Sequence, residues 1–455
     1  METTTDAVRR LWALCNVLRD DGITYHEYLG ELTYLLFLKL ANELDIERDV
    51  PSQFRWDALR SQPESVILER YQDALRALGV SSNPKLARIF EDSRTAIRSG
   101  HSLRRLIEGI ASIDWYRGGQ NGIGDIYEGL IEKNATESRY GAGQYFTPRA
   151  LVEALVSVSR PQGSDVIYDP AVGTAGFLVA AGLQSAGRSR HEPKLVGQEL
   201  VRDVQRMALM NLQLHGLEGD IRVGDTLSAN PADVGASLCI TNPPFGVKGG
   251  LTSQQMDLLD FPTSNKQLAF IQHVYKSLIP NGRAVVVVPD NVLFESGVAA
   301  ALRTHLLDNF DLHTILRLPA GIFYATGVRT SVLFFARTGP SQSTWVYDLR
   351  NGVAGFTKRR QLNHSDLVDF TDAYGADPLG RASRNENDRF RMLSRADLRD
   401  SGDRLDFDAM LQRSTSPTGT PTEMSEMIVQ ELQQALASAQ DLARLLRESE
   451  EVANG

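Results

Sequence analysis

The sequence predicts an α/β fold, in which a doubly wound sheet domain follows an all-α N-terminal domain and precedes a C-terminal helical tail. Three patterns predict it: helical periodicity over residues 1–135, short apolar runs alternating with helical segments over 136–340, and a regular apolar stripe after residue 422. With 455 residues, of which 42% are hydrophobic and 23% charged, the chain can build two cores from an ordinary globular composition.

The N-terminal segment, residues 1–135, is expected to be helical because its apolar residues recur at spacings of three and four. Leu32, Leu35 and Leu36 show this spacing, as do Leu103, Leu106 and Ile107 later in the segment, and there is little β-branched alternation. Prolines and glycines punctuate the connections between these helical stretches, at Pro51, Pro63, Gly79 and Pro84.

The segment 136–340 has the pattern of a sheet whose strands are buried on both faces. Helical stretches long enough to cross over a sheet separate most of its apolar runs, which is typical of a doubly wound α/β domain. The last run could form an antiparallel hairpin with the preceding one at the end of the sheet. The expected strands are residues 166–168, 195–198, 221–223, 238–241, 284–288, 313–316 and 330–335.

The remaining two segments are less informative. Residues 341–421 are polar, with weak periodicity, and we assign them no role. Residues 422–455 resume a helix with an apolar stripe that either docks on a partner or packs back on its own chain. The stripe consists of Val429, Leu432, Leu436, Ala439, Ala443 and Leu446.

The bulk chemistry indicates an intracellular protein. No apolar run is long enough for a membrane helix and the first residues do not form a signal peptide, so we expect a cytoplasmic location. Cys15 and Cys239 lie far apart in apolar surroundings, which indicates reduced thiols and no metal site. The net charge of -9 is unfavourable for a protein that binds DNA alone, because phosphate contacts come mainly from Lys and Arg.

A cofactor site is expected where the run 166–168 enters the sequence Asp-Pro-Ala-Val-Gly-Thr-Ala-Gly, because glycines at a strand-to-helix turn let the backbone approach a ligand. An acid at this turn would repel a pyrophosphate and attract an ammonium group. Acids at the ends of the next two strands suit ribose hydroxyls and an adenine amino group. The ligand-binding residues from these strand ends are Asp169, Ala171, Gly173, Thr174, Ala175, Gly176, Glu199 and Asp225.

The fourth run ends in Asn242, Pro243, Pro244 and Phe245, which we predict to be the catalytic residues. Two prolines make a rigid loop without N–H donors, so the loop carbonyls and the Asn242 amide oxygen are free to accept. Two acceptors that hold the hydrogens of a conjugated exocyclic amine would pull its nitrogen toward tetrahedral geometry, and Phe245 offers a face on which a flipped base can stack. The competing interpretation is a simple strand-terminating turn.

Together with the segment Gln-Tyr-Phe-Thr-Pro-Arg, these motifs resemble the gamma-class amino-methyltransferases, and specifically the modification (M) subunits of type I restriction-modification systems. The resemblance covers nearly the whole chain. It implies that S-adenosylmethionine contacts this segment and that residues 242–245 bind the target adenine. The segment consists of Gln144, Tyr145, Phe146, Thr147, Pro148 and Arg149, where Thr147 could cap a helix that has Pro148 at its first position.

The resemblance implies a Rossmann-like S-adenosylmethionine-dependent methyltransferase domain at 136–340, acting on adenine N6 of double-stranded DNA. It also implies partners, namely a specificity subunit that reads the DNA sequence, with two M subunits to one specificity subunit, and a restriction subunit as an optional third. Such partners would supply phosphate contacts that an acidic chain lacks. Two alternatives stay open: the same fold methylating a protein glutamine amide, and an assembly subunit without catalysis.

Overall fold

The computed structural model describes residues 4–23, 25–43, 47–113, 115, 120–137, 147–186, 191–245, 250–323, 328–351, 355–357 and 360–406. Met1–Arg404 forms one compact unit, and the second unit, Leu405–Gly455, has only its first two residues among those described. The predicted C-terminal helix and its apolar stripe therefore lie outside the described residues, as do Gln144, Tyr145 and Phe146.

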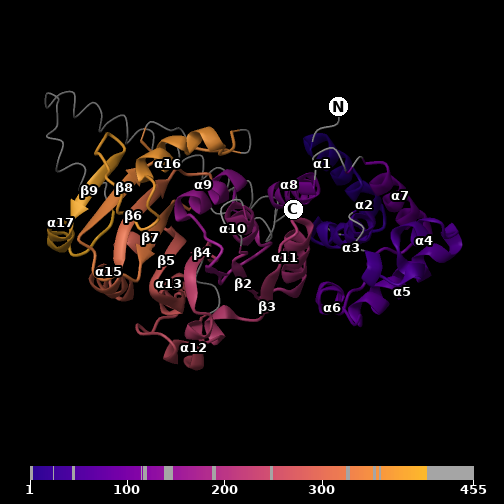
Figure 1. The fold of residues 1–455 in the computed structure, drawn as a ribbon, viewed down its shortest axis with the longest axis horizontal. Helices are drawn as coiled ribbons and strands as arrows, with labels where there is room; N and C mark the ends of the chain where they lie inside the picture. Colours follow the sequence, from indigo (N-terminus) through magenta and orange to yellow (C-terminus); the bar gives the residue numbers. More distant parts are fainter. Residues whose placement is uncertain are drawn as a thin grey trace, which may run out of the picture. The chain divides into compact units, whose positions relative to one another are not determined.

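The first part of the chain is all helical, as predicted (Figure 1). The predicted helical periodicity is confirmed in α7, in which Leu103, Leu106 and Ile107 are buried. The Ser99 hydroxyl caps this helix by accepting a hydrogen bond from the Ser102 N–H at 3.0 Å. The helices are α1 (Thr4–Ala13), α2 (Cys15–Asp20), α3 (Tyr25–Glu43), α4 (Trp56–Arg60), α5 (Glu64–Gly79), α6 (Pro84–Phe90), α7 (Gly100–Ala111) and α8 (Gln120–Glu137), with short 3₁₀ turns at Glu47–Asp49 and Ser52–Phe54.

The second part is a nine-stranded sheet in the order β3-β2-β1-β4-β5-β7-β6-β8-β9. Strands β1 to β5 run parallel to one another, whereas β7 runs antiparallel to both β5 and β6. The strands are β1 (Val166–Asp169), β2 (Lys194–Glu199), β3 (Gly219–Val223), β4 (Ala236–Thr241), β5 (Leu278–Pro289), β6 (Asp311–Leu318), β7 (Thr330–Ala336), β8 (Ser343–Asp348) and β9 (Phe390–Ser394).

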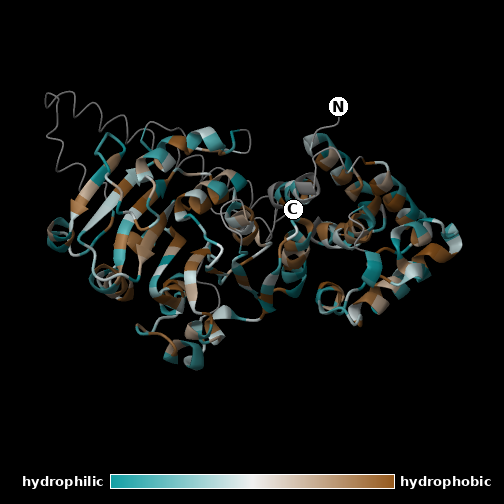
Figure 2. Ribbon diagram, in the orientation of Figure 1, coloured by the Kyte–Doolittle hydropathy of each residue, from teal (hydrophilic) through white to brown (hydrophobic). Residues whose placement is uncertain are grey.

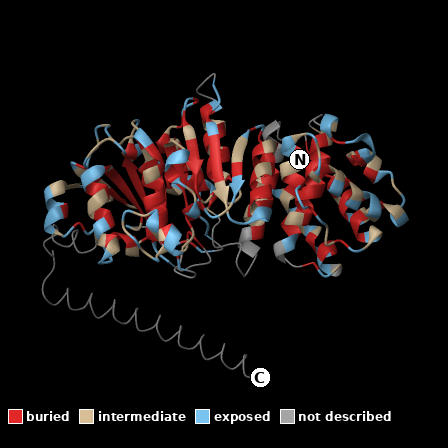
Figure 3. Ribbon diagram, turned by 90° about the horizontal axis from the view of Figure 1, so that it is seen from below, coloured by how far each residue is buried: buried red, intermediate tan, exposed pale blue. Residues whose placement is uncertain are grey.

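Helices connect β1 to β2, β2 to β3, β4 to β5 and β5 to β6 and cover the sheet, which confirms the predicted doubly wound α/β class. The central strands are apolar (Figure 2) and buried (Figure 3), as a sheet covered on both faces requires. The helices are α9 (Arg149–Ser159), α10 (Gly176–Ala186), α11 (Arg202–Leu214), α12 (Ser253–Asp257), α13 (Lys266–Ser277), α14 (Asn291–Phe294), α15 (Val298–Asn309), α16 (Val368–Tyr374) and α17 (Arg395–Asp400), with 3₁₀ turns at Thr226–Ser228, Pro231–Asp233 and His364–Asp366.

The antiparallel pair β6 and β7 forms as predicted, but it is not the end of the sheet. Strand β8 pairs in parallel with β6, and β9 pairs antiparallel with β8, so the polar segment without an assigned role extends the sheet by two strands. The aromatic rings of Trp345 and Phe390 pack at 4.7 Å between these two strands. The sheet therefore continues beyond residue 340.

Helix α11 joins the helical part to the sheet. Its residues Met210 and Leu214 belong to the hydrophobic core of the helical part. Arg206 is 6% exposed, and its guanidinium donates to the carbonyl oxygens of Ile89 at 2.6 Å and Glu91 at 2.8 Å, at the end of α6. A buried guanidinium with carbonyl partners satisfies the helix end that it covers.

Among the described helices, none combines the length and the apolar character that crossing a membrane requires.

Candidate active site

The turn between β1 and α10 is held in a tight conformation. Gly173 and Ala175 have φ angles of +53° and +68°, in the left-handed region, and the Ala175 N–H donates to the Val172 carbonyl at 2.8 Å. The left-handed region costs a non-glycine residue of order 1–3 kcal/mol, and such strain clusters at ligand-binding turns. The Asn211 side chain of α11 donates to the Thr174 carbonyl at 2.9 Å and so connects the turn to this helix.

Glu199, at the end of β2, lies against this turn. Its Oε2 accepts the Gly173 N–H at 3.1 Å and its Oε1 accepts the Val201 N–H at 2.9 Å. Burial raises the pKa of this carboxyl, while these backbone N–H groups oppose the rise. Each oxygen keeps a further lone pair, so the carboxylate can support the turn and still accept two ligand hydroxyls.

Asp169 lies beneath the turn and connects it to β4. Its carboxyl is 1% exposed and its Oδ1 accepts from the Thr241 hydroxyl at 2.6 Å and the Ala171 N–H at 3.0 Å. Burial raises the pKa of Asp169 to about 7, against the effect of these two hydrogen bonds. Because Thr241 immediately precedes Asn242, this carboxyl links the predicted cofactor turn to the predicted catalytic loop.

Asp225, at the end of β3, is exposed and held from two sides. Its Oδ1 accepts the Leu227 N–H at 3.0 Å, and its Oδ2 accepts from the Gln255 side chain at 2.8 Å. The predicted acids Asp169, Glu199 and Asp225 thus occupy the ends of three adjacent strands, β1, β2 and β3.

Asn242 follows β4 and is 6% exposed. Its Nδ2 donates to the Thr147 hydroxyl oxygen at 2.9 Å, whereas its Oδ1 is buried and has no hydrogen-bond partner among the described residues. A buried carbonyl oxygen that receives no hydrogen bond costs about 1–3 kcal/mol. A ligand that brings a hydrogen-bond donor to Oδ1 would remove this cost. Pro243 and Pro244 follow without any N–H of their own.

The ring of Phe245 packs edge-on against Phe323, with the ring centroids 5.5 Å apart and the planes at 89°. Phe323 lies beyond the end of β6 and is buried. Nearby, Gly321 has a φ of +85°, and a Cβ at this position would lie 1.9 Å from the Phe356 carbonyl oxygen. The loop after β6 therefore packs closely against the backbone at Phe356 and places an aromatic side chain beside the predicted catalytic loop.

The expected helix cap by Thr147 is wrong. Helix α9 begins at Arg149 with Pro148 at the capping position, and within the described residues no side chain caps it. Thr147 lies one residue too early, and its hydroxyl instead accepts from Asn242. The reason is that Pro148 itself has an extended backbone, with ψ at 135°, so the helix begins one residue later than the sequence pattern predicted.

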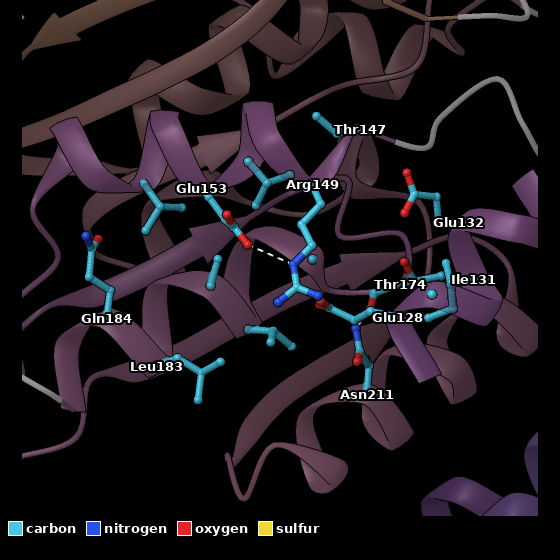
Figure 4. A pocket seen from close by; sticks show the side chains of 16 residues that line it. Glu128, Ile131, Glu132, Thr147, Arg149, Glu153, Thr174, Leu183, Gln184 and Asn211 are labelled. Atoms are coloured by element: carbon cyan, nitrogen blue, oxygen red, sulfur yellow. Dashed lines mark hydrogen bonds and ion pairs between the residues drawn. The ribbon is translucent and has the colours of Figure 1, made fainter. Parts of the chain in front are cut away.

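Arg149 points toward α8 (Figure 4). Its guanidinium pairs with Asp125 at 2.7 Å, Glu128 at 3.3 Å and Glu153 at 2.7 Å. These three carboxylates raise the pKa of Arg149 above its ordinary value, although burial opposes this. Among the described residues, the ion-pair partners of Arg149 are acidic side chains. Any effect of Arg149 on cofactor binding would therefore be indirect, through the position of the backbone near Thr147.

A cavity of about 380 Å³ extends from the turn between α8, α9 and α10 (Figure 4). It contains four of the predicted cofactor residues, Thr147, Arg149, Thr174 and Gly176. Its other walls include apolar side chains of α8, α9 and α10, the acids Glu128, Glu132 and Glu153, and the amides Gln184 and Asn211.

Four contributors to this region were missed by sequence reasoning: Thr241, Asn211, Gln255 and Phe323. Thr241 stands directly before the Asn-Pro-Pro motif, so its position at the strand end was available from the sequence. The other three lie 30 or more residues from their partners. No local pattern could have identified them.

Comparisons with known proteins agree on one family. Residues 119–416 match the family model described as "N-6 DNA Methylase", and residues 8–110 match the "HsdM N-terminal domain". The type I restriction enzyme EcoKI methylase subunit of Escherichia coli strain K12 is 40% identical over 443 residues, which cover 90% of this chain and 83% of that protein. The StySPI methylase subunit of Salmonella potsdam is 40% identical over 437 residues, covering 89% and 82%.

Solved structures give the same result. The crystal structure of the EcoKI M protein covers 97% of this chain and 96% of its own, with 34% identity and a TM-score of 0.55. A structure from work on complex assembly and conformational transition of the type I R-M system covers 98% and 99%, with 25% identity and a TM-score of 0.74.

Proposed function

This chain belongs to the N-6 DNA methylase family as a methylase subunit of the type I restriction enzymes, an enzyme for N6-adenine methylation of DNA, and we propose how its residues serve that reaction. The resemblance inferred from the sequence is thereby confirmed, and the glutamine-amide and non-catalytic alternatives fall away. The proposal concerns the cofactor, the site residues and the partners.

The cofactor is proposed to be S-adenosylmethionine, which when bound supplies an electrophilic methyl group on a positive sulfonium. The hydrogen-bond acceptors at the strand ends fit this cofactor. Glu199 has lone pairs left for two ribose hydroxyls, and Asp225 at the next strand end can accept from the adenine amino group. The buried negative charge of ionised Asp169 favours the methionine ammonium at the turn.

The observation that carries the assignment of the target base is the buried Asn242 Oδ1, for which the described part of the chain provides no donor. An adenine N6 amine brings two hydrogens, one for this oxygen and one for a loop carbonyl of the Asn-Pro-Pro segment. Hydrogen bonds from both N6 hydrogens to these two oxygens would withdraw the nitrogen lone pair from conjugation with the ring and direct it at the methyl group. The N–C bond would form as the bond between the methyl carbon and the sulfonium breaks, its electron pair returning to sulfur as a neutral thioether, and the proton that the nitrogen loses would pass to water.

The protein's part in this step is positioning, because the N6 proton becomes acidic only after the methyl group arrives. The Thr147 hydroxyl accepts a hydrogen bond from Asn242 Nδ2 and so fixes the orientation of the amide. In this orientation Oδ1 is the atom that faces the base. Phe245, supported by Phe323, offers a stacking face for the flipped adenine, worth about 1–3 kcal/mol in comparable base–aromatic contacts.

Asn242→Ala tests this assignment in the assembled enzyme. Transfer of labelled methyl groups to duplex DNA should be lost, while calorimetric titration with S-adenosylmethionine should give a dissociation constant close to that of the wild type. A variant that still methylates DNA at the wild-type rate would remove Asn242 from the mechanism.

We propose double-stranded DNA and a specificity subunit as partners, with two copies of this chain to one specificity subunit and a restriction subunit as an optional addition. The net charge of -9 supports the need for a partner that contributes cationic phosphate contacts. Because the substrate is DNA, we place the enzyme in the cytoplasm. Copurification with the specificity subunit, followed by native mass measurement, tests the stoichiometry.

A further inference from the structure

We propose that Asp125, Glu128 and His215 bind a divalent transition-metal ion that joins α8 to the end of α11. One ligand atom from each of the three residues lies within 4.8 Å of the other two. Asp125 and Glu128 are three residues apart on α8 and so share one helix face, and His215 directly follows α11. None of the three belongs to the proposed catalytic or cofactor residues.

The orientation of His215 indicates a missing ligand. The side chain is 9% exposed, and its Nδ1 lies 2.8 Å from the Asn211 carbonyl oxygen, so Nδ1 is the nitrogen that donates to the backbone and Nε2 is the nitrogen that remains for a ligand. Nε2 is buried and has no hydrogen-bond partner among the described residues. A metal-binding histidine is held in this way, with one nitrogen donating to a backbone carbonyl and the other facing the ion.

Gly124 makes this orientation possible. A Cβ at this position would lie 2.3 Å from Nε2 and 2.5 Å from Cε1 of His215, so the imidazole ring rests directly on the glycine. The absence of a side chain at this point of α8 lets the ring approach the helix that carries the two carboxylates.

The carboxylates retain oxygens for an ion despite their contacts with Arg149. The guanidinium takes Asp125 Oδ1 at 2.7 Å and Glu128 Oε2 at 3.3 Å, which leaves the second oxygen of each carboxylate. Metal-ligating carboxylates commonly have such outer hydrogen-bond donors. Arg149 also serves Glu153, so one positive charge faces three acids, and this excess of negative charge favours a cation.

One imidazole nitrogen and two carboxylate oxygens favour zinc or manganese over magnesium, which prefers oxygen ligands and keeps its waters. Water would complete the coordination, and the cavity lined by Glu128 and Asn211 provides a route of entry. The bound ion would connect α8, which leads toward Thr147, to α11, whose Asn211 fixes the turn at Thr174.

Calorimetric titration of the chelator-treated full chain with ZnCl₂, MnCl₂ and MgCl₂ tests the proposal. We expect one equivalent of zinc or manganese to bind, with magnesium at least about tenfold weaker. His215→Asn removes Nε2 and keeps an amide that can donate to the Asn211 carbonyl. It should weaken binding more than about 100-fold, because even outer-shell changes cost 10- to 100-fold.

Glu132→Gln is the matched control, since it removes a carboxylate from the same helix and the same cavity but outside the cluster. Its affinity should equal that of the wild type. Asp125→Asn, at a part-exposed position, provides a second test that does not disturb a buried ring, and it should also weaken binding. With cobalt, the wild type and Glu132→Gln should show visible d–d absorption that His215→Asn lacks.

Three results would overturn the proposal: no binding of any of the three ions to the wild type, binding that His215→Asn and Asp125→Asn leave unchanged, or equal loss in Glu132→Gln. The first would mean that the three side chains lie together without binding a metal ion. The second would mean that the ion binds only to scattered surface groups.

Discussion

Thr147→Val should slow methyl transfer while leaving S-adenosylmethionine affinity almost unchanged. Valine has the shape of threonine but offers no acceptor, so the Asn242 Nδ2, now 2.9 Å from the Thr147 hydroxyl, would lose its partner. A buried polar group without its partner costs about 1–3 kcal/mol. The amide escapes that cost only by rotating, and rotation turns Oδ1 away from the base.

This free energy sets the expected rate. If all of it appears in the barrier, 1–3 kcal/mol corresponds to a loss of about 5- to 150-fold in kcat. The assay is transfer of tritiated methyl groups by the enzyme assembled with its specificity subunit, with both substrates saturating, and calorimetry gives the cofactor dissociation constant separately. Thr147→Ser is the control, because it restores the hydroxyl without the methyl group and should recover most of the rate.

Two results would refute this reasoning. One is a Thr147→Val enzyme within about twofold of the wild-type kcat, which would mean that the amide keeps its orientation without the hydroxyl. The other is a fall in cofactor affinity with kcat unchanged, which would make Thr147 a cofactor ligand and nothing more.

Three further predictions concern Glu199, Asp169 and Gly321. Glu199→Gln should weaken S-adenosylmethionine binding by about tenfold or more in calorimetry, because an amide offers one acceptor oxygen where the carboxylate has two. The pKa of Asp169, about 7 in the folded chain, is raised above the ordinary value of 3.8, so the folded state holds this proton more tightly. The contribution of Asp169 to stability should therefore be fully present below pH 4 and be lost, by up to about 4 kcal/mol, as the pH rises through 7, and denaturant titrations should show Asp169→Asn without this part of the slope. Gly321→Ala should lower both the melting temperature and kcat, since its Cβ would collide with the Phe356 carbonyl and shift Phe323; an unchanged melting curve would show that the loop can yield.

The strands of the central sheet were predictable because both faces of that sheet are buried. The apolar run at residues 284–288 lies within β5, and Val286 and Val287 are almost wholly inaccessible to solvent. Such strands leave an uninterrupted apolar run that is recognisable from one sequence. The domain boundaries at 135, 340 and 421 stay a prediction.

Strands β8 and β9 were missed for the opposite physical reason. β9 lies at the edge of the sheet, and only its first residue, Phe390, is fully buried, whereas Arg391 and Met392 are exposed. An edge strand with one weakly covered face has the composition of a loop. Its pairing with β8 depends on tertiary contacts that periodicity does not report.

The order of the site residues was predictable, but their partners were not. Parallel strands bring their carboxyl ends to one edge, so the positions of Asp169, Glu199 and Asp225 follow from the strand assignment. The contact of Thr147 with Asn242 joins residues 95 apart in the chain, and the ion pairs of Arg149 depend on how α8 packs. Neither leaves a local pattern in the sequence.

Two hydrogen bonds connect the proposed cofactor side of the site to the target-base side. Asp169 beneath the turn bonds the hydroxyl of Thr241, and Thr147 at the start of α9 bonds the amide of Asn242. The proposed catalytic loop is therefore held by β1 on one side and by the residue that precedes Pro148 and α9 on the other, and both contacts border the proposed cofactor site. Because transfer between two bound groups depends steeply on their distance and angle, a displacement of the turn would move the acceptor that orients the amine. Cofactor binding and base orientation should accordingly be coupled, and the Thr147 and Asp169 variants should each uncouple them through one of the two connections.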